Sequence, residues 1–319
     1  MRIGVVGSGG RAAACLEGFA AVEGCEPVAV SARNAATGSK LARQYRLELL
    51  GDWRELVQRD DVDAVAISTF NDSHGPITIA ALEAGKHVYV EYPLARRPEE
   101  GARILELAAG GEQVVRTTHA EPLSPPHQAL KAVVADRGPL LIGLFVRLTP
   151  GRGARPEILF NLAISGPPAL FFAYQVYPLV DLFGPAAWVE AHAEYGELNR
   201  DGGYRRFVNQ VNVGFAAGGT HQWTWAGGID IAAAEQYQRL VLAGGSLLHR
   251  DGAWQQSSTS GEEPVPVTEA GGQTLEALFA ADVEADGDGW RQDLQRAFQA
   301  AQIGWAAERA AQAGGRVRI

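Results

Sequence analysis

The stretch Arg2-Ile3-Gly4-Val5-Val6-Gly7-Ser8-Gly9-Gly10-Arg11-Ala12 decides the fold class of this chain. It opens with an apolar run typical of a buried strand, and a G-x-G-x-x-A pattern follows at once. Glycine allows a tight turn and a close approach of the backbone, and the free N–H groups at the start of a following helix attract a pyrophosphate. The sequence therefore predicts a dinucleotide-binding loop made of Gly7, Ser8, Gly9, Gly10 and Arg11.

The first third of the chain alternates short apolar runs with amphipathic stretches. The runs predict strands over residues 3–6, 27–31, 64–68, 87–91 and 113–117. The stretches predict helices over residues 11–22, 36–45, 76–84 and 98–109. Continuous apolar strands between helices indicate a parallel sheet that is covered on both faces. We predict a doubly wound Rossmann domain over residues 1–122.

The hydrophobic pattern changes after a predicted helix at residues 124–136. Alternation with a period of two, typical of antiparallel strands with one open face, runs over residues 140–149, 207–215, 220–226 and 237–242. Helices are predicted over residues 168–183 and 290–313, and a loop over 257–272. The fold class is α/β: an N-terminal Rossmann domain and, over residues 123–319, a C-terminal α+β domain with a large, mainly antiparallel open sheet.

Composition excludes several classes of partner. The formal net charge of -9 disfavours nucleic acid or an anionic membrane surface, because both require a basic patch. The sequence contains no apolar run of about 18 residues, the length needed to span a bilayer, and it shows no export signal at its start. We therefore expect a cytoplasmic protein. The 2 cysteines and 7 histidines show no metal-ligand spacing, and we predict free thiols and no metal.

The end of the second predicted strand bears on the choice of cofactor. It reads Ser31-Ala32-Arg33-Asn34, and no acidic residue follows until Glu48. NAD-binding sites place a carboxylate here for the ribose hydroxyls, whereas an arginine can bind a 2′-phosphate. We predict contacts from Ser31 and Arg33 to NADPH, with NADH as the alternative.

The turn over residues 68–74 ends a strand on the side where such sheets bind ligands. Its small hydroxyl and amide side chains suit the nicotinamide half of the cofactor. We predict cofactor contacts from Ser68, Thr69, Asn71 and His74.

A strand that stops at Glu91-Tyr92-Pro93 forms a rigid ledge, because proline restricts its own backbone and that of the preceding residue. We predict that Glu91 contacts the cofactor ribose and that Tyr92 donates a hydrogen bond or proton to the substrate, with a packing role as the alternative. His119 and Glu121 follow the last Rossmann strand and are further catalytic candidates, or else form structural hydrogen bonds.

The Gly7 turn, the segment Ala-Leu-Glu-Ala-Gly-Lys-His-Val at residues 81–88, the Glu91-Tyr92-Pro93 ledge and the α+β second half resemble the glucose-fructose oxidoreductase, inositol dehydrogenase and rhizopine catabolism family, abbreviated Gfo/Idh/MocA. The resemblance implies Glu-Lys-Pro at the ledge, where the lysine helps to move the proton of a sugar alcohol. Tyr92 replaces that lysine. Tyr177 likewise stands where many members have a histidine four residues before Asp181.

Within the family, Val90-Glu91-Tyr92-Pro93-Leu94, His119-Ala120-Glu121 and a later Leu-Phe-Gly resemble the biliverdin reductase branch. This resemblance implies NADPH-dependent hydride transfer to the central methine carbon of biliverdin, a linear tetrapyrrole, to give bilirubin. The cleft would be flat and partly apolar, with cations for two propionates. The helix before Leu-Phe-Gly lacks the branch's arginine. Arg147 is a candidate substitute, with a surface ion pair as the alternative, and less constrained candidates are Arg152, Arg155, Arg205 and Arg206. The expected substrate contacts are Arg147, Tyr174, Gln175, Tyr177 and Asp181.

Other functions remain open from the sequence. One is oxidation or reduction of a sugar, cyclitol or imine by the same fold. Another is a non-catalytic sensor that binds NADP(H) or a pigment, which the loss of the lysine would allow. The open sheet face suggests a homo-oligomer.

Overall fold

The parallel sheet of the N-terminal region has the strand order β3-β2-β1-β4-β5-β6, counted over the described residues 1–153, 155–268, 272–285 and 287–319 of this computed structural model. Its strands are β1 (Arg2–Val6), β2 (Glu26–Ser31), β3 (Glu48–Leu50), β4 (Ala64–Ile67), β5 (His87–Val90) and β6 (Val115–Thr117). The strand order reverses between β1 and β4, and doubly wound sheets bind ligands at the carboxyl ends of the strands beside this point. The predicted Rossmann architecture is confirmed.

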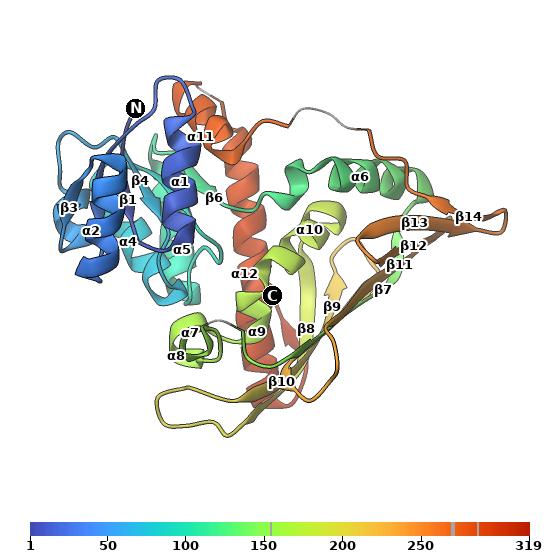
Figure 1. The fold of residues 1–319 in the computed structure, drawn as a ribbon. Helices are drawn as coiled ribbons and strands as arrows, with labels where there is room; N and C mark the ends of the chain where they lie inside the picture. The colour runs from blue at the N-terminus through green and yellow to red at the C-terminus, as the bar shows by residue number, and fades with distance from the viewer. Residues whose placement is uncertain (154, 269–271, 286) are drawn as a thin grey trace. The chain divides into compact units, whose positions relative to one another are not determined.

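Helices flank this sheet (Figure 1). They are α1 (Gly10–Ala20), α2 (Ala35–Tyr45), α3 (Trp53–Val57), α4 (Asn71–Glu83) and α5 (Pro98–Gly110). α1 buries Ala12, Cys15, Leu16 and Phe19, whose spacing of three and four residues forms one apolar stripe. The predicted start of α4 at residue 76 was wrong, because Pro76 lies inside the helix rather than at its first position.

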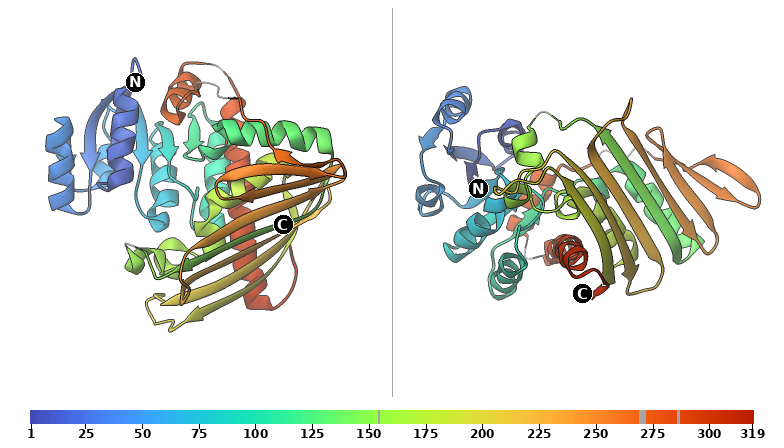
Figure 2. Two further views of the ribbon diagram at one scale, coloured as in Figure 1. Left: turned by 45° about the vertical axis from the view of Figure 1, so that its right-hand side comes forward. Right: turned by 90° about the horizontal axis from the view of Figure 1, so that it is seen from below.

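The second sheet has the order β14-β13-β12-β11-β7-β10-β9-β8-β15 within the described ranges (Figure 2). Its strands are β7 (Leu140–Pro150), β8 (Ala186–Gly196), β9 (Arg206–Phe215), β10 (Thr220–Ile229), β11 (Glu235–Leu242), β12 (Gly245–Arg250), β13 (Ala253–Ser258), β14 (Gly261–Pro264) and β15 (Val317–Arg318). Among the described pairs only β7 and β10 run parallel, so the sheet is mainly antiparallel, as predicted. The predicted loop at 257–272 was partly wrong, since β13 and β14 occupy its start.

Further helices follow the Rossmann strands. They are η1 (Glu121–Leu123), α6 (Pro125–Arg137), α7 (Pro156–Leu159), α8 (Leu162–Ser165), α9 (Pro168–Phe171), α10 (Ala173–Phe183), α11 (Leu275–Glu284) and α12 (Gly289–Ala313). The single helix predicted over residues 168–183 is broken at Phe172, which separates α9 from α10. None of the described helices has both the length and the apolar character needed to span a membrane.

One face of the second sheet is buried. Side chains of β10 alternate between buried and partly exposed, and Trp223 and Trp225 on the buried face are both 0% exposed. The Trp225 indole N–H donates to Gln175 of α10 at 2.6 Å, which ties this helix to the sheet. Leu141 and Ile142 of β7 are each 55% exposed. A homo-oligomer through the open face stays a prediction.

Contacts divide the chain into two units. The first comprises Met1–His119 and Gln273–Phe298, and the second comprises Ala120–Gly272 and Gln299–Ile319. The C-terminal part of the first unit is anchored by Arg116 of β6, whose side chain is 7% exposed and bonds to Asp282 at 2.5 and 2.8 Å and to Asp293 at 2.9 Å. The predicted boundary at residue 122 assigns residues 273–298 to the second domain, whereas the contacts group them with the first unit.

Candidate functional site

The glycine loop between β1 and α1 leaves the helix end open. Gly7 has φ of +134°, its N–H donates to the Ser31 carbonyl at 2.8 Å, and a Cβ at Gly7 would collide with the Ser68 carbonyl. Gly9 is the N-cap of α1 and brings no side chain to cap the helix. A Cβ at Gly9 or Gly10 would meet no described atom within 4 Å. The loop therefore fits a pyrophosphate bound by N–H groups of the first helical turn.

Arg11 and Glu91 connect this helix end to the end of β5. Nε and Nη2 of Arg11 donate to one carboxylate oxygen of Glu91, at 2.8 and 2.5 Å. The Glu91 side chain is 13% exposed and that of Arg11 is 63% exposed. Two residues that the sequence assigned separately to the cofactor thus form one ion pair beside the glycine loop.

The end of β2 and the start of α2 gather groups that suit a phosphate. The Arg33 guanidinium lies 5.1 Å from the centre of the Phe70 ring. The Ser8 and Thr37 hydroxyls are 2.7 Å apart, and Thr37 was not predicted from the sequence. The first turn of α2 reads Ala-Ala-Thr-Gly, so it carries no carboxylate that would repel an anion. Ser31 is 2% exposed and contributes its carbonyl to the Gly7 turn.

The turn after β4 is organised by His74, which is 1% exposed. Its Nδ1 lies 2.8 Å from the Pro93 carbonyl oxygen and its Nε2 lies 3.4 Å from the Thr69 carbonyl oxygen. Burial lowers the pKa of His74, while the two neighbouring carbonyl groups act in the opposite direction. The ring thus joins the turn to the ledge, and this geometry favours a positioning role over proton transfer. Asn71 is the first residue of α4, and the Ser68 N–H donates to the Val6 carbonyl.

Tyr92 of the ledge contacts His119. Their rings are stacked, with centroids 5.0 Å apart and planes inclined by 16°. His119 is 7% exposed, and burial lowers its pKa to about 3. Its imidazole is therefore neutral at physiological pH and suits the support of Tyr92 better than proton donation. Glu121, the other catalytic candidate, is exposed and begins η1 in the second unit.

An aromatic cavity of about 480 Å³ lies within the second unit. Arg147 and Tyr174, both predicted to bind the substrate, line it. The ring lining comes from Phe160, Phe171, Phe172, Tyr174, Tyr204 and Phe207, and Arg152 adds a second guanidinium. The phenylalanines were not predicted from the sequence, because their segments are far apart along the chain and show no common motif.

The other predicted substrate residues have different surroundings. Gln175 accepts the Trp225 indole N–H, and Tyr177 is 3% exposed. The Asp181 side chain is 3% exposed and bonds to His127 at 2.9 Å and to Lys131 at 3.0 Å, both on α6. None of the three lines the aromatic cavity in the described structure, so their substrate contacts stay predictions.

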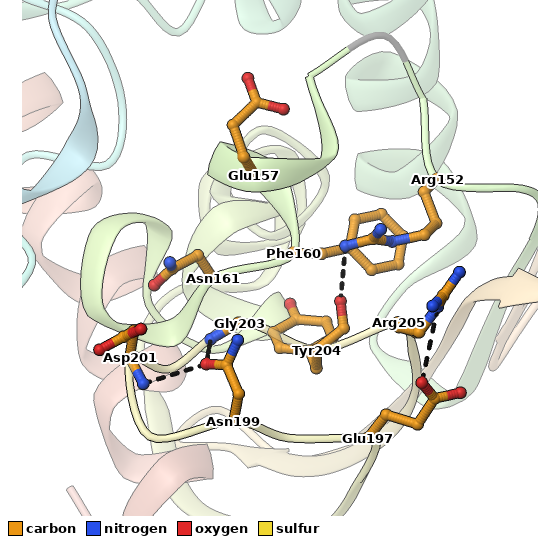
Figure 3. A pocket seen from close by; sticks show the side chains of 10 residues that line it. All are labelled: Arg152, Glu157, Phe160, Asn161, Glu197, Asn199, Asp201, Gly203, Tyr204 and Arg205. Carbon is orange, nitrogen blue, oxygen red and sulfur yellow. Dashed lines mark hydrogen bonds and ion pairs between the residues drawn. The ribbon is translucent and has the colours of Figure 1, made fainter.

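A second cavity, of about 500 Å³, shares Arg152, Phe160 and Tyr204 with the first (Figure 3). Its other lining is polar and includes Glu197, which lies 3.6 Å from Arg205. In Figure 3 the Arg152 side chain lies against the Phe160 ring. Over the described residues, no three His, Cys, Asp or Glu side chains are grouped so as to hold a metal ion.

Comparison with known proteins agrees with this geometry. Residues 1–119 match the Gfo/Idh/MocA family model, described as an oxidoreductase family with an NAD-binding Rossmann fold. A 4-carboxy-2-hydroxymuconate-6-semialdehyde dehydrogenase from Sphingobium is 33% identical over 129 residues, which cover 40% of this chain and 41% of that protein. The matched part thus spans less than half of this relative.

Solved structures extend the similarity over the whole chain. Biliverdin reductase from Synechocystis, in complex with biliverdin and NADP+, has a TM-score of 0.84 at 23% identity, covering 98% of this chain and 99% of that one. Levoglucosan dehydrogenase in complex with NADH has a TM-score of 0.77 at 19% identity, covering 100% and 99%. At these identities the likeness shows the fold. Residues 1–119 of this chain, by contrast, match the Gfo/Idh/MocA oxidoreductase family model by sequence.

Proposed function

We propose that the protein is an NADPH-dependent reductase that transfers a hydride to the central methine carbon of biliverdin and so produces bilirubin. The coarser part, an NAD(P)-dependent oxidoreductase, is supported by the family of the N-terminal domain and by the open glycine loop ahead of α1. The preference for NADPH is supported by Arg33 and by the lack of a carboxylate at the start of α2.

The observation that carries the choice of substrate is the aromatic cavity of the second unit. Its lining combines phenylalanine and tyrosine rings with Arg147 and Arg152. A sugar needs polar partners for each hydroxyl, because an unpaired buried hydroxyl costs free energy. A flat conjugated acid instead packs its body against rings and its carboxylates against guanidinium groups. The Synechocystis reductase of similar fold was solved with such a ligand.

The ledge fits reduction better than oxidation of an alcohol. A bound NADPH would supply the hydride, and the product also gains one proton at a pyrrole nitrogen. Tyr92 stands where the family resemblance implies a lysine, so no lysine amine is present there to take an alcohol proton. The neutral His119 ring holds the Tyr92 ring by stacking, and the Tyr92 hydroxyl can donate a hydrogen bond to the substrate.

One assay tests the proposal. Purified protein is mixed with biliverdin and either NADPH or NADH, and the absorbance of bilirubin and of the nicotinamide is followed. We expect bilirubin to form with consumption of one NADPH per product, and more slowly with NADH. The Arg103→Ala variant is the control for substitutions of site residues in the same assay. Arg103 lies on α5 and pairs only with Glu83 and Glu106 among the described residues.

Other outcomes of the same assay would identify a different function. No bilirubin with either cofactor would exclude biliverdin reduction. Turnover of levoglucosan or another sugar would then support an oxidoreductase for sugars, as the fold of levoglucosan dehydrogenase suggests. Tight NADPH binding without oxidation by any offered substrate would support a sensor.

A further inference from the structure

Two arginines line the aromatic cavity without a carboxylate partner among the described residues. The Nη1–H of Arg147 donates a hydrogen bond to Oε1 of Gln236 at 2.7 Å. The Nη2–H of Arg152 donates a hydrogen bond to the Tyr204 carbonyl oxygen at 2.9 Å. The Nε atom of each arginine is buried and has no hydrogen-bond partner in the part of the chain that the structure describes. A buried charged N–H without an acceptor costs free energy. Each guanidinium carries five N–H donors, and the one hydrogen bond that each makes through an Nη atom leaves Nη donors for a ligand in the cavity.

Both guanidinium groups are also held in place by rings. Arg147 lies 5.8 Å from the centre of Phe172 and Arg152 lies 5.3 Å from the centre of Phe160. One ring contact and one hydrogen bond restrict each guanidinium before a ligand arrives. A ligand then loses less free energy in ordering them, because the binding groups are already oriented.

The cavity around the two arginines suits a flat apolar body. Its volume of about 480 Å³ lies within the range of small-molecule sites, about 300–1,000 Å³. Phe171, Phe172 and Phe207 supply ring surfaces, and Tyr174 is partly buried beside Arg147. An uncharged polyol would leave both guanidinium charges without an anionic partner, whereas carboxylates pair with guanidinium groups in a planar way.

We propose that Arg147 and Arg152 are specificity-determining residues that bind the carboxylates of a flat, conjugated acid in this cavity. This inference rests on the proposed function in taking the aromatic cavity as the substrate site. It assigns the anionic ends of the substrate to β7 and to the loop after it, rather than to α10, which carries no arginine.

The test measures binding without any nicotinamide cofactor. Biliverdin and its dimethyl ester, which has the same conjugated body without the charges, are titrated against the protein, and induced circular dichroism of the pigment reports binding. We expect the diacid to bind at least tenfold more tightly than the ester. Arg147→Gln and Arg152→Gln should each weaken diacid binding tenfold or more and leave ester binding within twofold.

Two controls exclude a general effect of removing charge or of misfolding. Arg205→Gln removes an arginine that lines the neighbouring cavity but already pairs with Glu197, so diacid binding should stay within twofold. Arg147→Lys keeps a positive charge and should recover part of the affinity that Arg147→Gln loses. Far-ultraviolet circular dichroism of each variant checks its fold.

The outcomes separate this inference from the proposed function. Equal affinity for diacid and ester, unchanged affinity in both glutamine variants, or no binding of the diacid would overturn the arginine assignment. Diacid binding with the expected losses, but no bilirubin after NADPH is added, would leave the assignment standing and exclude the reductase. Bilirubin formation with an unchanged KM for biliverdin in both glutamine variants would support the reductase and overturn the arginine assignment.

Discussion

The phenol ring of Tyr92 lies flat against the imidazole of His119, with the ring planes inclined by only 16°. Tyr92 comes from the end of β5 and His119 from the segment after β6, and these neighbouring parallel strands place the two rings together. Because burial keeps His119 neutral, the contact is between two uncharged rings. The stack fixes the Tyr92 ring independently of its hydroxyl, so the two roles of Tyr92 can be separated by substitution.

Tyr92→Phe removes the hydroxyl and keeps the ring. If the hydroxyl donates to the substrate, kcat should fall tenfold or more, which corresponds to about 1.4 kcal/mol of barrier, with KM changed less. Steady-state kinetics with biliverdin and NADPH measure this. His119→Phe keeps a ring partner for Tyr92 and should retain kcat within about threefold. Unchanged kinetics in Tyr92→Phe would assign Tyr92 to packing.

Arg33→Met tests the choice of cofactor. The substitution removes the only side-chain cation of the segment 31–34, so the dissociation constant for NADP+ should rise tenfold or more while that for NAD+ stays within twofold. Isothermal titration calorimetry with both cofactors measures this without turnover. Thr37→Val should give a smaller change of the same kind. A wild-type protein that binds NAD+ more tightly would contradict the Arg33 assignment.

Two glycines of the loop should respond differently to alanine. Gly7→Ala forces a left-handed φ on a residue with a Cβ and drives that Cβ into the Ser68 carbonyl, so the free energy of unfolding should fall by about 2 kcal/mol or more. Gly10→Ala adds a methyl group to open space, so stability should be retained and cofactor affinity should fall. Urea denaturation and cofactor titration measure the two effects. A stable Gly7→Ala protein would show that the turn rearranges.

Acid sensitivity should arise in part from His221. This residue of β10 is 1% exposed, neither ring nitrogen has a hydrogen-bond partner among the described residues, and burial lowers its pKa to about 3. The pKa of this histidine is higher in the unfolded state, about 6.5. The contribution of His221 to the free energy of unfolding is therefore present above that pH and is lost as the pH falls toward 3. The slope is at most about 1.4 kcal/mol per pH unit for one proton.

The His221→Leu variant should therefore lose less stability than the wild type between pH 6.5 and 4, as measured by urea denaturation. His119 has the same direction of shift and remains in both proteins, so a residual slope is expected. The control is His192→Leu, which removes an exposed histidine of β8 and should keep the wild-type slope. Equal slopes in His221→Leu and the wild type would show that His221 is not the titrating group.

The parallel strands of the first unit could be predicted from the sequence because their signals are local. The predicted cofactor residues lie at the ends of these strands or in the turns and first helical turns that follow them, and parallel strands bring their carboxyl ends together. Edge elements were missed: β3 has three residues and α3 has five, which is too short for a periodic pattern. β13 and β14 were missed because polar residues dominate both strands, and the sheet pairs them through backbone bonds.

The aromatic cavity of the second unit was predicted less well because it depends on contacts between distant segments. Arg147 was found from strand alternation, but the Phe172 ring under it follows a break between α9 and α10 that no local signal predicts. Asp181 was assigned to the substrate from the family resemblance. In the structure its carboxylate is held by His127 and Lys131 of α6, and that pairing is set by tertiary packing.

The buried ion pairs of Arg116 with Asp282 and Asp293 connect two segments of the first unit that lie far apart along the chain. The match to the family model ends at residue 119, yet the folding unit that contains it is completed more than 150 residues later, by α11 and the start of α12. A gene fusion that exchanged everything after residue 119 would leave a buried guanidinium without its carboxylates, a loss of about 3–5 kcal/mol for a buried pair. An exchange that preserves this ion pair would therefore replace only the residues between the two pieces of the first unit.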